Sequence, residues 1–189
     1  MTDVGAGRRR PRETYAERRE RRSAVDDPAV VLDAGLRFLE ARPRSVAEVR
    51  RRLGDAGYRV ALIEGAVARL LELSLLDDAA FATAWVASRD RAHPRGARAL
   101  RAELFRKGID ASTIADVLAH REASSEISGE GDEGSADEAA ARQLVERHGR
   151  ALDRIEDPRK RRQRTYALLA RHGFDPDIAG RLSAEGPAE

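Results

Sequence analysis

Apolar residues recur at helical spacing along most of the chain, and short breaks punctuate the pattern. Positions three and four apart are repeatedly Val, Leu, Ile or Ala, which is typical of helices that bury one face. Capping residues, prolines and glycines delimit the segments. The pattern predicts helices over about residues 28–41, 45–56, 60–73, 77–90, 97–107, 110–120, 138–148, 159–172 and 176–182.

A signature of Leu-x-x-x-Gly followed by a large apolar residue occurs three times, at Leu53–Tyr58, Leu104–Ile109 and Leu169–Phe174. Glycine directly after a helix suits a left-handed cap. Each copy closes the second helix of a three-helix unit, and units of this length fall in the range of helical solenoid repeats. The sequence therefore predicts an all-α fold, with about three tandem three-helix repeats forming an elongated, curved helical array.

Two polar stretches interrupt this plan. The first is an arginine-rich arm, expected to be helical in part around residues 15–22. The second is acidic and without periodicity; it could mimic DNA, occupy basic residues of the same chain, or be a tolerated insertion, which we favour. The predicted organisation is a flexible basic arm at 1–25, repeat 1 at 26–75, repeat 2 at 76–120, an acidic disordered insert at 121–137, repeat 3 at 138–183 and a loose tail at 184–189.

The stretch 75–86 joins the first two predicted repeats and holds the only tryptophan. Asp77 is a suitable N-cap, and Leu76 and Phe81 have the spacing of a hydrophobic staple. Trp85 follows Phe81 by one helical turn, on the same face. We predict that Trp85 is a core residue that holds the angle between repeats, and not a binding residue.

The composition argues against an enzyme. The chain has no cysteine, which excludes thiolate nucleophiles, disulfides and thiolate metal sites. The four histidines share no metal-ligand spacing, and no glycine-rich loop matches a phosphate-binding template. No catalytic, cofactor or metal residue is therefore predicted. No apolar run reaches membrane-spanning length, so a cytoplasmic protein is expected. At His172, the end of a helix is expected to favour a cationic ring.

Basic residues gather on the second helix of each predicted unit. Nearly all are arginine, whose fork suits phosphate or carboxylate, although the excess could reflect genomic base composition. If the units stack regularly, these helices form a basic stripe, the footprint of nucleic-acid contact; an ordinary solvated face is an equal alternative. No exposed aromatic is expected there, so contacts would go to the nucleic-acid backbone. The candidate stripe comprises Arg50, Arg51, Arg52, Arg91, Arg95, Arg98, Arg101, Arg106, Lys107, Arg159, Lys160, Arg161, Arg162 and Arg164.

Three stretches, Leu36–Val49, Leu75–Arg89 and Leu100–Ile109, together resemble the RecX family of bacterial regulatory proteins. The resemblance is strong over about residues 28–120 and weaker over 138–182. Ser74 stands where the family usually has glycine, so the turn there is expected to differ slightly.

The resemblance implies a protein that acts by binding, built of tandem three-helix repeats. It implies binding to the RecA recombinase filament on single-stranded DNA, and suppression of RecA ATPase, strand exchange and SOS co-protease activity. The expected partners are RecA and, weakly and without sequence specificity, single- or double-stranded DNA; a monomer is expected. Two interpretations stay open beside it: a general helical DNA-binding protein or transcriptional regulator acting without RecA, and a scaffold whose basic face is merely solvated.

Overall fold

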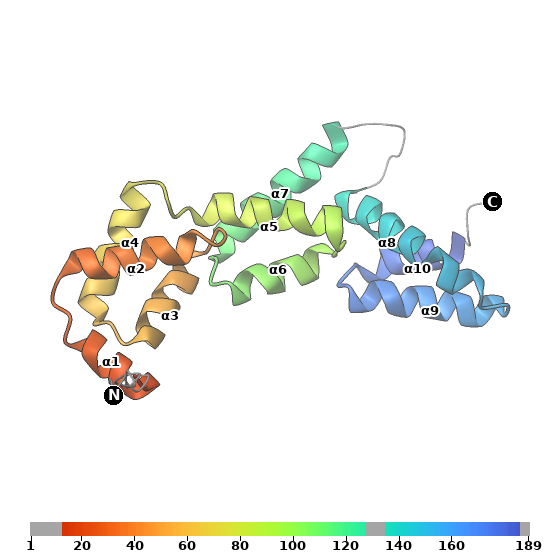
Figure 1. The fold of residues 1–189 in the computed structure, drawn as a ribbon. Helices are drawn as coiled ribbons and strands as arrows, with labels where there is room; N and C mark the ends of the chain where they lie inside the picture. The colour runs from red at the N-terminus through yellow and green to blue at the C-terminus, as the bar shows by residue number, and fades with distance from the viewer. Residues whose placement is uncertain (1–12, 128–134, 186–189) are drawn as a thin grey trace, which may run out of the picture. The chain divides into compact units, whose positions relative to one another are not determined.

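The computed structural model describes residues 13–127 and 135–185, and every regular element in those ranges is a helix (Figure 1). The predicted all-α class is confirmed. Expectations that fall on residues 1–12, 128–134 and 186–189 lie outside the described residues. The helices are α1 (Tyr15–Ser23), α2 (Pro28–Leu39), α3 (Val46–Ala56), α4 (Val60–Glu72), α5 (Asp78–Ala92), α6 (Ala97–Arg106), α7 (Ala111–Ile127), α8 (Ala136–Asp153), α9 (Pro158–Arg171) and α10 (Pro176–Glu185).

The chain divides into two compact units, Met1–Leu76 and Asp77–Glu189. In the first unit, α2, α3 and α4 pack on one another around a core that includes the fully buried Val49 and Leu70. Helix α1 lies against α3, where the Tyr15 hydroxyl donates to the Asp55 carbonyl at 2.8 Å. The expected partial helix in the basic arm is confirmed, and it buries none of its own residues.

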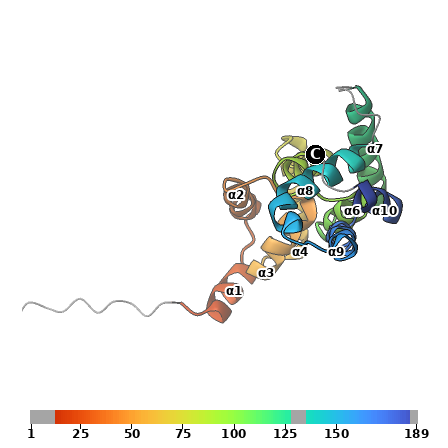
Figure 2. The ribbon, with the colours of Figure 1, turned by 90° about the vertical axis from the view of Figure 1, so that its right-hand side faces the viewer.

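The second unit contains two three-helix groups, each with its own apolar core. Helices α5, α6 and α7 enclose a cluster that includes Leu100, Leu104 and Ile114. Helices α8, α9 and α10 enclose another around Leu169 and Phe174, and α9 and α10 lie side by side in both views (Figure 1, Figure 2). Because the two apolar clusters are separate, the contacts that join the groups come from polar side chains and from the backbone.

The glycine caps predicted from the repeated signature are present in all three copies. Gly57, Gly108 and Gly173 have φ angles of 102°, 80° and 80°, in the left-handed region that glycine adopts without steric cost. The next amide donates back into the helix in each copy, which completes a Schellman motif. These bonds run from Tyr58 to Leu53 at 3.3 Å, from Ile109 to Leu104 at 3.2 Å and from Phe174 to Leu169 at 3.3 Å.

Ser74 adopts the same left-handed conformation with a side chain in place. Its φ is 54°, and within residues 13–127 and 135–185 it is the one non-glycine residue with positive φ. The Leu75 amide donates to the Leu70 carbonyl at 2.9 Å, so the helix end is still closed. The turn therefore keeps a backbone suited to glycine, at a cost of about 1 kcal/mol for the Cβ.

The boundaries around the predicted acidic insert are wrong at both ends. Helix α7 continues through Arg121 to Ile127, and α8 begins at Ala136 and runs to Asp153. No proline or glycine stands between Asp110 and Ile127 to end α7. The apolar periodicity stops at Arg121 because a buried arginine takes the next inward position.

The N-cap role of Asp77 is confirmed, since its carboxylate accepts from the Ala80 amide at 2.9 Å. Leu76 belongs to the core of the first unit and Phe81 to a core of the second, so their staple contact stays a prediction. Within the described ranges, no helix is long and apolar enough to cross a membrane.

Candidate functional site

The predicted stripe residues fall on four helices, one turn and one helix C-cap. Arg50, Arg51 and Arg52 lie on α3 in the first unit. The other members lie in the second unit, on the end of α5, the turn before α6, α6 itself with its C-cap, and α9. A single stripe through α3, α6 and α9 remains a prediction, whereas the α6 and α9 groups share one compact unit.

Helices α6 and α9 meet where one begins and the other ends. The Gly96 amide, just before α6, donates to the His172 carbonyl, just after α9, at 3.1 Å. A Cβ on Gly96 would overlap the backbone of Gly173 and Phe174, and a Cβ on Gly173 would lie 2.5 Å from that of Ala99. Two facing glycines thus let the backbones touch and fix how the two basic helices join.

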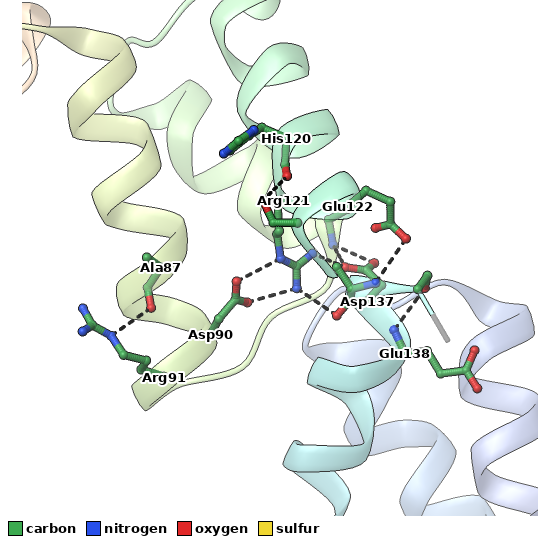
Figure 3. A network of polar contacts seen from close by, with 12 residues as sticks. Ala87, Asp90, Arg91, His120, Arg121, Glu122, Asp137 and Glu138 are labelled. Atoms are coloured by element: carbon green, nitrogen blue, oxygen red, sulfur yellow. Dashed lines mark hydrogen bonds and ion pairs between the residues drawn. The ribbon is translucent and has the colours of Figure 1, made fainter. Parts of the chain in front are cut away.

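A buried arginine clasps the two groups together. Arg121, near the end of α7, donates from Nε and Nη2 to the Asp90 carboxylate of α5, both at 3.0 Å. Its Nη1 donates to Asp137 of α8 at 2.5 Å, so one guanidinium bridges three helices (Figure 3). Burial alone would lower the pKa of Arg121, but its hydrogen bonds to the two aspartates outweigh this and raise the pKa. The side chain stays charged at every accessible pH.

Asp137 connects this clasp to the basic helix α6. Its two carboxylate oxygens accept from the Ala97 amide at 3.0 and 2.9 Å. Ala97 is the first residue of α6. The N-cap residue of α6 is Gly96, which has no side chain to accept from the free amides of the first turn. A carboxylate from α8 therefore satisfies a free amide of another helix and complements the positive end of its dipole.

Arg147 of α8 caps the C-terminal end of α5. Its guanidinium donates to the carbonyls of Ala92 at 2.7 Å and Arg91 at 2.6 Å. A cation at the C-terminal carbonyls of a helix is electrostatically favourable. The junction between α5–α7 and α8–α10 is thus made of exchanged helix caps and one ion-pair clasp.

Some predicted stripe residues serve the fold itself. Arg50 pairs with Glu64 at 2.7 Å, and Arg95 lies 3.7 Å from Glu103. Arg91 donates to the Ala87 carbonyl at 3.3 Å, and Lys107 lies 4.7 Å from the centre of the Trp85 ring. These cations are already engaged within the chain, so they are weaker candidates for contact with another molecule.

The remaining cations lack such partners, and all of them except the half-buried Arg161 are exposed to solvent. Within the described parts of the chain, their side chains make no hydrogen bond or ion pair. Arg52 has one other contact, since its guanidinium lies 5.6 Å from the centre of the Phe38 ring. Unpaired arginines keep their whole charge available for an anionic partner. These unpaired cations are Arg51, Arg52, Arg98, Arg101, Arg106, Arg159, Lys160, Arg161, Arg162 and Arg164.

Trp85 is only half-buried, so its prediction as a simple core residue needs correction. It stacks on Phe81 with ring centres 6.0 Å apart, as its spacing suggests. Its Nε1 donates to Glu103 at 2.9 Å, and Arg89 lies 4.4 Å from its ring centre. Burial raises the pKa of Glu103, but hydrogen bonds from Arg89 and Trp85 together lower it. Trp85 therefore joins the apolar core of this group to a charged surface network.

Two further predictions are wrong. The basic helices do carry exposed aromatics, since Phe105 on α6 is 71% exposed and Tyr166 on α9 is 40% exposed. The second concerns His172, whose pKa is lowered, chiefly by burial. The hydrogen bond to the Leu168 carbonyl raises the pKa by less than burial lowers it, and repulsion from Arg95 and His148 lowers it further. A C-terminal helix position is outweighed there by the packing of α9 against the turn before α6.

Sequence reasoning missed Arg121, Asp90 and Asp137 as residues that position the basic helices. One signal was available, since Arg121 continues the inward spacing of Ile114 and Val117 along α7. The partners of Arg121 lie 31 and 16 positions away, and nothing local identifies them.

Comparison with known proteins gives consistent matches along the chain. Models of the first, second and third three-helix domains of RecX match residues 32–70, 77–118 and 136–182. The regulatory protein RecX of Mycobacterium avium (strain 104) is 37% identical over 145 residues, which cover 76% of this chain and 77% of that protein. The regulatory protein RecX of Thermobifida fusca (strain YX) is 34% identical over 150 residues, covering 79% and 75%.

Solved structures agree with this assignment at the level of the fold. The crystal structure of RecX from Lactobacillus salivarius has a TM-score of 0.64 and 21% identity, and the match covers 85% of this chain and 96% of that one. A second crystal structure of a regulatory protein RecX also has a TM-score of 0.64, at 22% identity, with 80% and 68% covered. The three matched domains and the named relatives show that this chain belongs to the RecX family of regulatory proteins.

Proposed function

We propose that this protein binds the RecA recombinase and its filament on single-stranded DNA, and lowers RecA ATPase, strand-exchange and SOS co-protease activity. Membership of a family of regulatory proteins supports a regulatory role. The protein acts by binding, as a monomer in the cytoplasm, without a cofactor or catalytic step. Its DNA contacts are weak and without sequence specificity.

The observation that carries the proposal is the set of unpaired arginines on α6 and α9. Arg98 and Arg101 are exposed and have no ion-pair partner in the described parts of the chain, and the same holds for Arg159, Arg162 and Arg164. A cluster of unpaired cations attracts polyanions and releases their counterions. A filament of RecA on DNA offers such a target, whereas an ordinary solvated face would be balanced by nearby carboxylates.

The clasp at Arg121 supports the proposal by holding these two helices in one arrangement. Ordering a binding surface before contact reduces the entropy lost on association. Asp137 is bound by both Arg121 and the start of α6, so the clasp and the basic surface are directly connected. We infer that the junction presets the orientation of α6 and α9 toward the filament.

The test is RecA ATPase on single-stranded DNA with substoichiometric amounts of this protein. We expect the parent protein to lower the rate and the double variant Arg98→Ala/Arg101→Ala to do so only at higher concentration. Arg69→Ala is the matched control, because Arg69 pairs with Glu72 at 2.9 Å on the surface of α4. The salt dependence of DNA binding should weaken in the double variant, by about 1.4 in the slope of log K against log salt if two phosphate contacts are lost.

An unchanged ATPase rate together with no binding to the filament would refute the proposal. Tight binding to one duplex sequence, with no effect on RecA, would instead favour a transcriptional regulator that reads base edges with a recognition helix. Equal loss of inhibition in the Arg69→Ala control would show that the α6 arginines have no special role.

A further inference from the structure

The two basic helices of the second unit carry the same three-residue arrangement. Two arginines three positions apart are followed by an aromatic residue four positions later: Arg98, Arg101 and Phe105 on α6, and Arg159, Arg162 and Tyr166 on α9. At 3.6 residues per turn, the three side chains of each set fall within about 60° of arc, over about 10 Å of helix. Each set therefore forms one narrow stripe, which we call an arginine–aromatic stripe.

Both stripes face solvent. Phe105 is 71% exposed, and Tyr166 is 40% exposed. All four arginines are exposed, and their side chains have no hydrogen-bond or ion-pair partner in the described ranges. The apolar face of α6 is instead formed by Leu100 and Leu104, both fully buried, so the core does not require Phe105.

The shared spacing is not a by-product of the repeat. Phe105 lies three positions before its cap glycine, Gly108, whereas Tyr166 lies seven positions before Gly173. The aromatic residues therefore occupy different levels of the repeated unit, one helical turn apart. A single exposed apolar side chain needs no explanation. An exposed aromatic residue beside two unpaired arginines, found at two non-equivalent levels of the repeat, does need an explanation.

We propose that the two arginine–aromatic stripes bind single-stranded nucleic acid, with Phe105 and Tyr166 as platforms on which unpaired bases stack. This stacking proposal rests on the proposed function in one respect, since it requires that the protein contacts nucleic acid. Aromatic rings beside a cationic groove are the usual means of holding single strands, because every base has a π-face. In a duplex those faces are covered by neighbouring base pairs, so the stripes distinguish single strands from duplex. An acidic protein surface would satisfy the arginines but leave both rings without a partner.

The test is fluorescence anisotropy of three labelled probes at one salt concentration: a single-stranded oligothymidine, an abasic strand of the same length, and a duplex. We expect Phe105→Ala and Tyr166→Ala each to weaken binding to oligothymidine by about 5- to 150-fold, as the loss of one stacked base predicts. Binding to the abasic strand and the duplex should change less than twofold. Phe105→Trp should retain affinity, whereas Phe105→Leu should not, because leucine keeps the apolar bulk without the ring.

Val60→Ala is the control, since Val60 is 73% exposed on α4 and belongs to neither stripe. Helicity measured by circular dichroism should be equal in all variants. Equal losses on the three probes, or no loss on oligothymidine, would overturn the stacking role. In either case the effect of the parent protein on RecA ATPase decides the proposed function separately. Loss of RecA inhibition with unchanged binding to oligothymidine would overturn the inference and assign the rings to the protein partner.

Discussion

Replacing Arg121 with alanine is expected to lower the free energy of unfolding of the second unit by about 3 kcal/mol. The side chain of Arg121 is 8% exposed, and that of Asp137 is 14% exposed. Alanine would leave two carboxylates without their common cation, which typically costs 3–5 kcal/mol for a buried pair. The lower end applies because Asp90 is 33% exposed and keeps part of its hydration.

The assay is urea denaturation combined with hydrogen exchange. The Ala97 amide donates to Asp137, and the Gly96 amide donates to His172 across the same junction. Both amides should exchange faster in the Arg121→Ala variant, before global unfolding, because the α5–α7 and α8–α10 groups separate locally. Arg121→Lys should give an intermediate loss, since lysine keeps the charge but cannot form the fork to both carboxylates.

Arg69→Ala is the control, because Arg69 and Glu72 form an ion pair whose side chains are 55% and 64% exposed. Exposed pairs of this kind contribute less than about 1 kcal/mol. The reasoning is refuted if the two alanine variants lose the same stability, or if exchange at Ala97 stays as slow as in the parent protein.

Four further outcomes are expected. Ser74→Gly should raise stability by about 1 kcal/mol in thermal or urea denaturation, because glycine relieves the left-handed strain at φ 54°. Trp85→Ala should cost about 2–3 kcal/mol in urea denaturation, less than a fully buried tryptophan, while Trp85→Phe should cost about 1 kcal/mol for the lost Nε1 hydrogen bond. Gly96→Ala should cost about 1–3 kcal/mol by forcing backbones apart at the α6–α9 junction, whereas Gly65→Ala, with open space around it, should be stabilising. Because the pKa of His172 is lowered in the folded protein, the unfolded chain takes up a proton at this residue at a higher pH than the folded chain does. The contribution of His172 to stability is therefore full above about pH 6.5 and is lost as the pH falls through its folded pKa. In the His172→Gln variant, the denaturation midpoint should depend less on pH across that range.

Features determined by neighbouring residues were readable from the sequence. The glycine caps at Gly57, Gly108 and Gly173 were predictable, because a left-handed residue after a helix favours glycine and the pattern repeats. The N-cap at Asp77 followed from one side chain and the amides of the next turn. Apolar periodicity identified the helices and the all-α class, because a helix that buries one face has apolar residues three and four positions apart along the sequence.

The exposure of side chains was harder to predict, because it depends on which face of each helix finds a partner. Phe105 follows the buried Leu104 directly and yet is 71% exposed, since α7 covers only one side of α6. Trp85 has the spacing of a core residue, but its edge reaches the surface beside Arg89 and Glu103. Hydrophobic character alone does not distinguish these positions from the core.

From the sequence of this protein alone followed the positions of most helices, their grouping into three-helix units, and the helix of each unit on which arginine gathers. Which arginines are exposed without a partner, and which are engaged within the chain, depends on the tertiary structure. Arg121 reads in sequence as the start of a polar insert, but packing makes it the clasp between Asp90 and Asp137, and so the residue that positions α6. The physical reason is that capping and periodicity act over a few residues, whereas ion pairs and backbone contacts join residues that folding alone brings together.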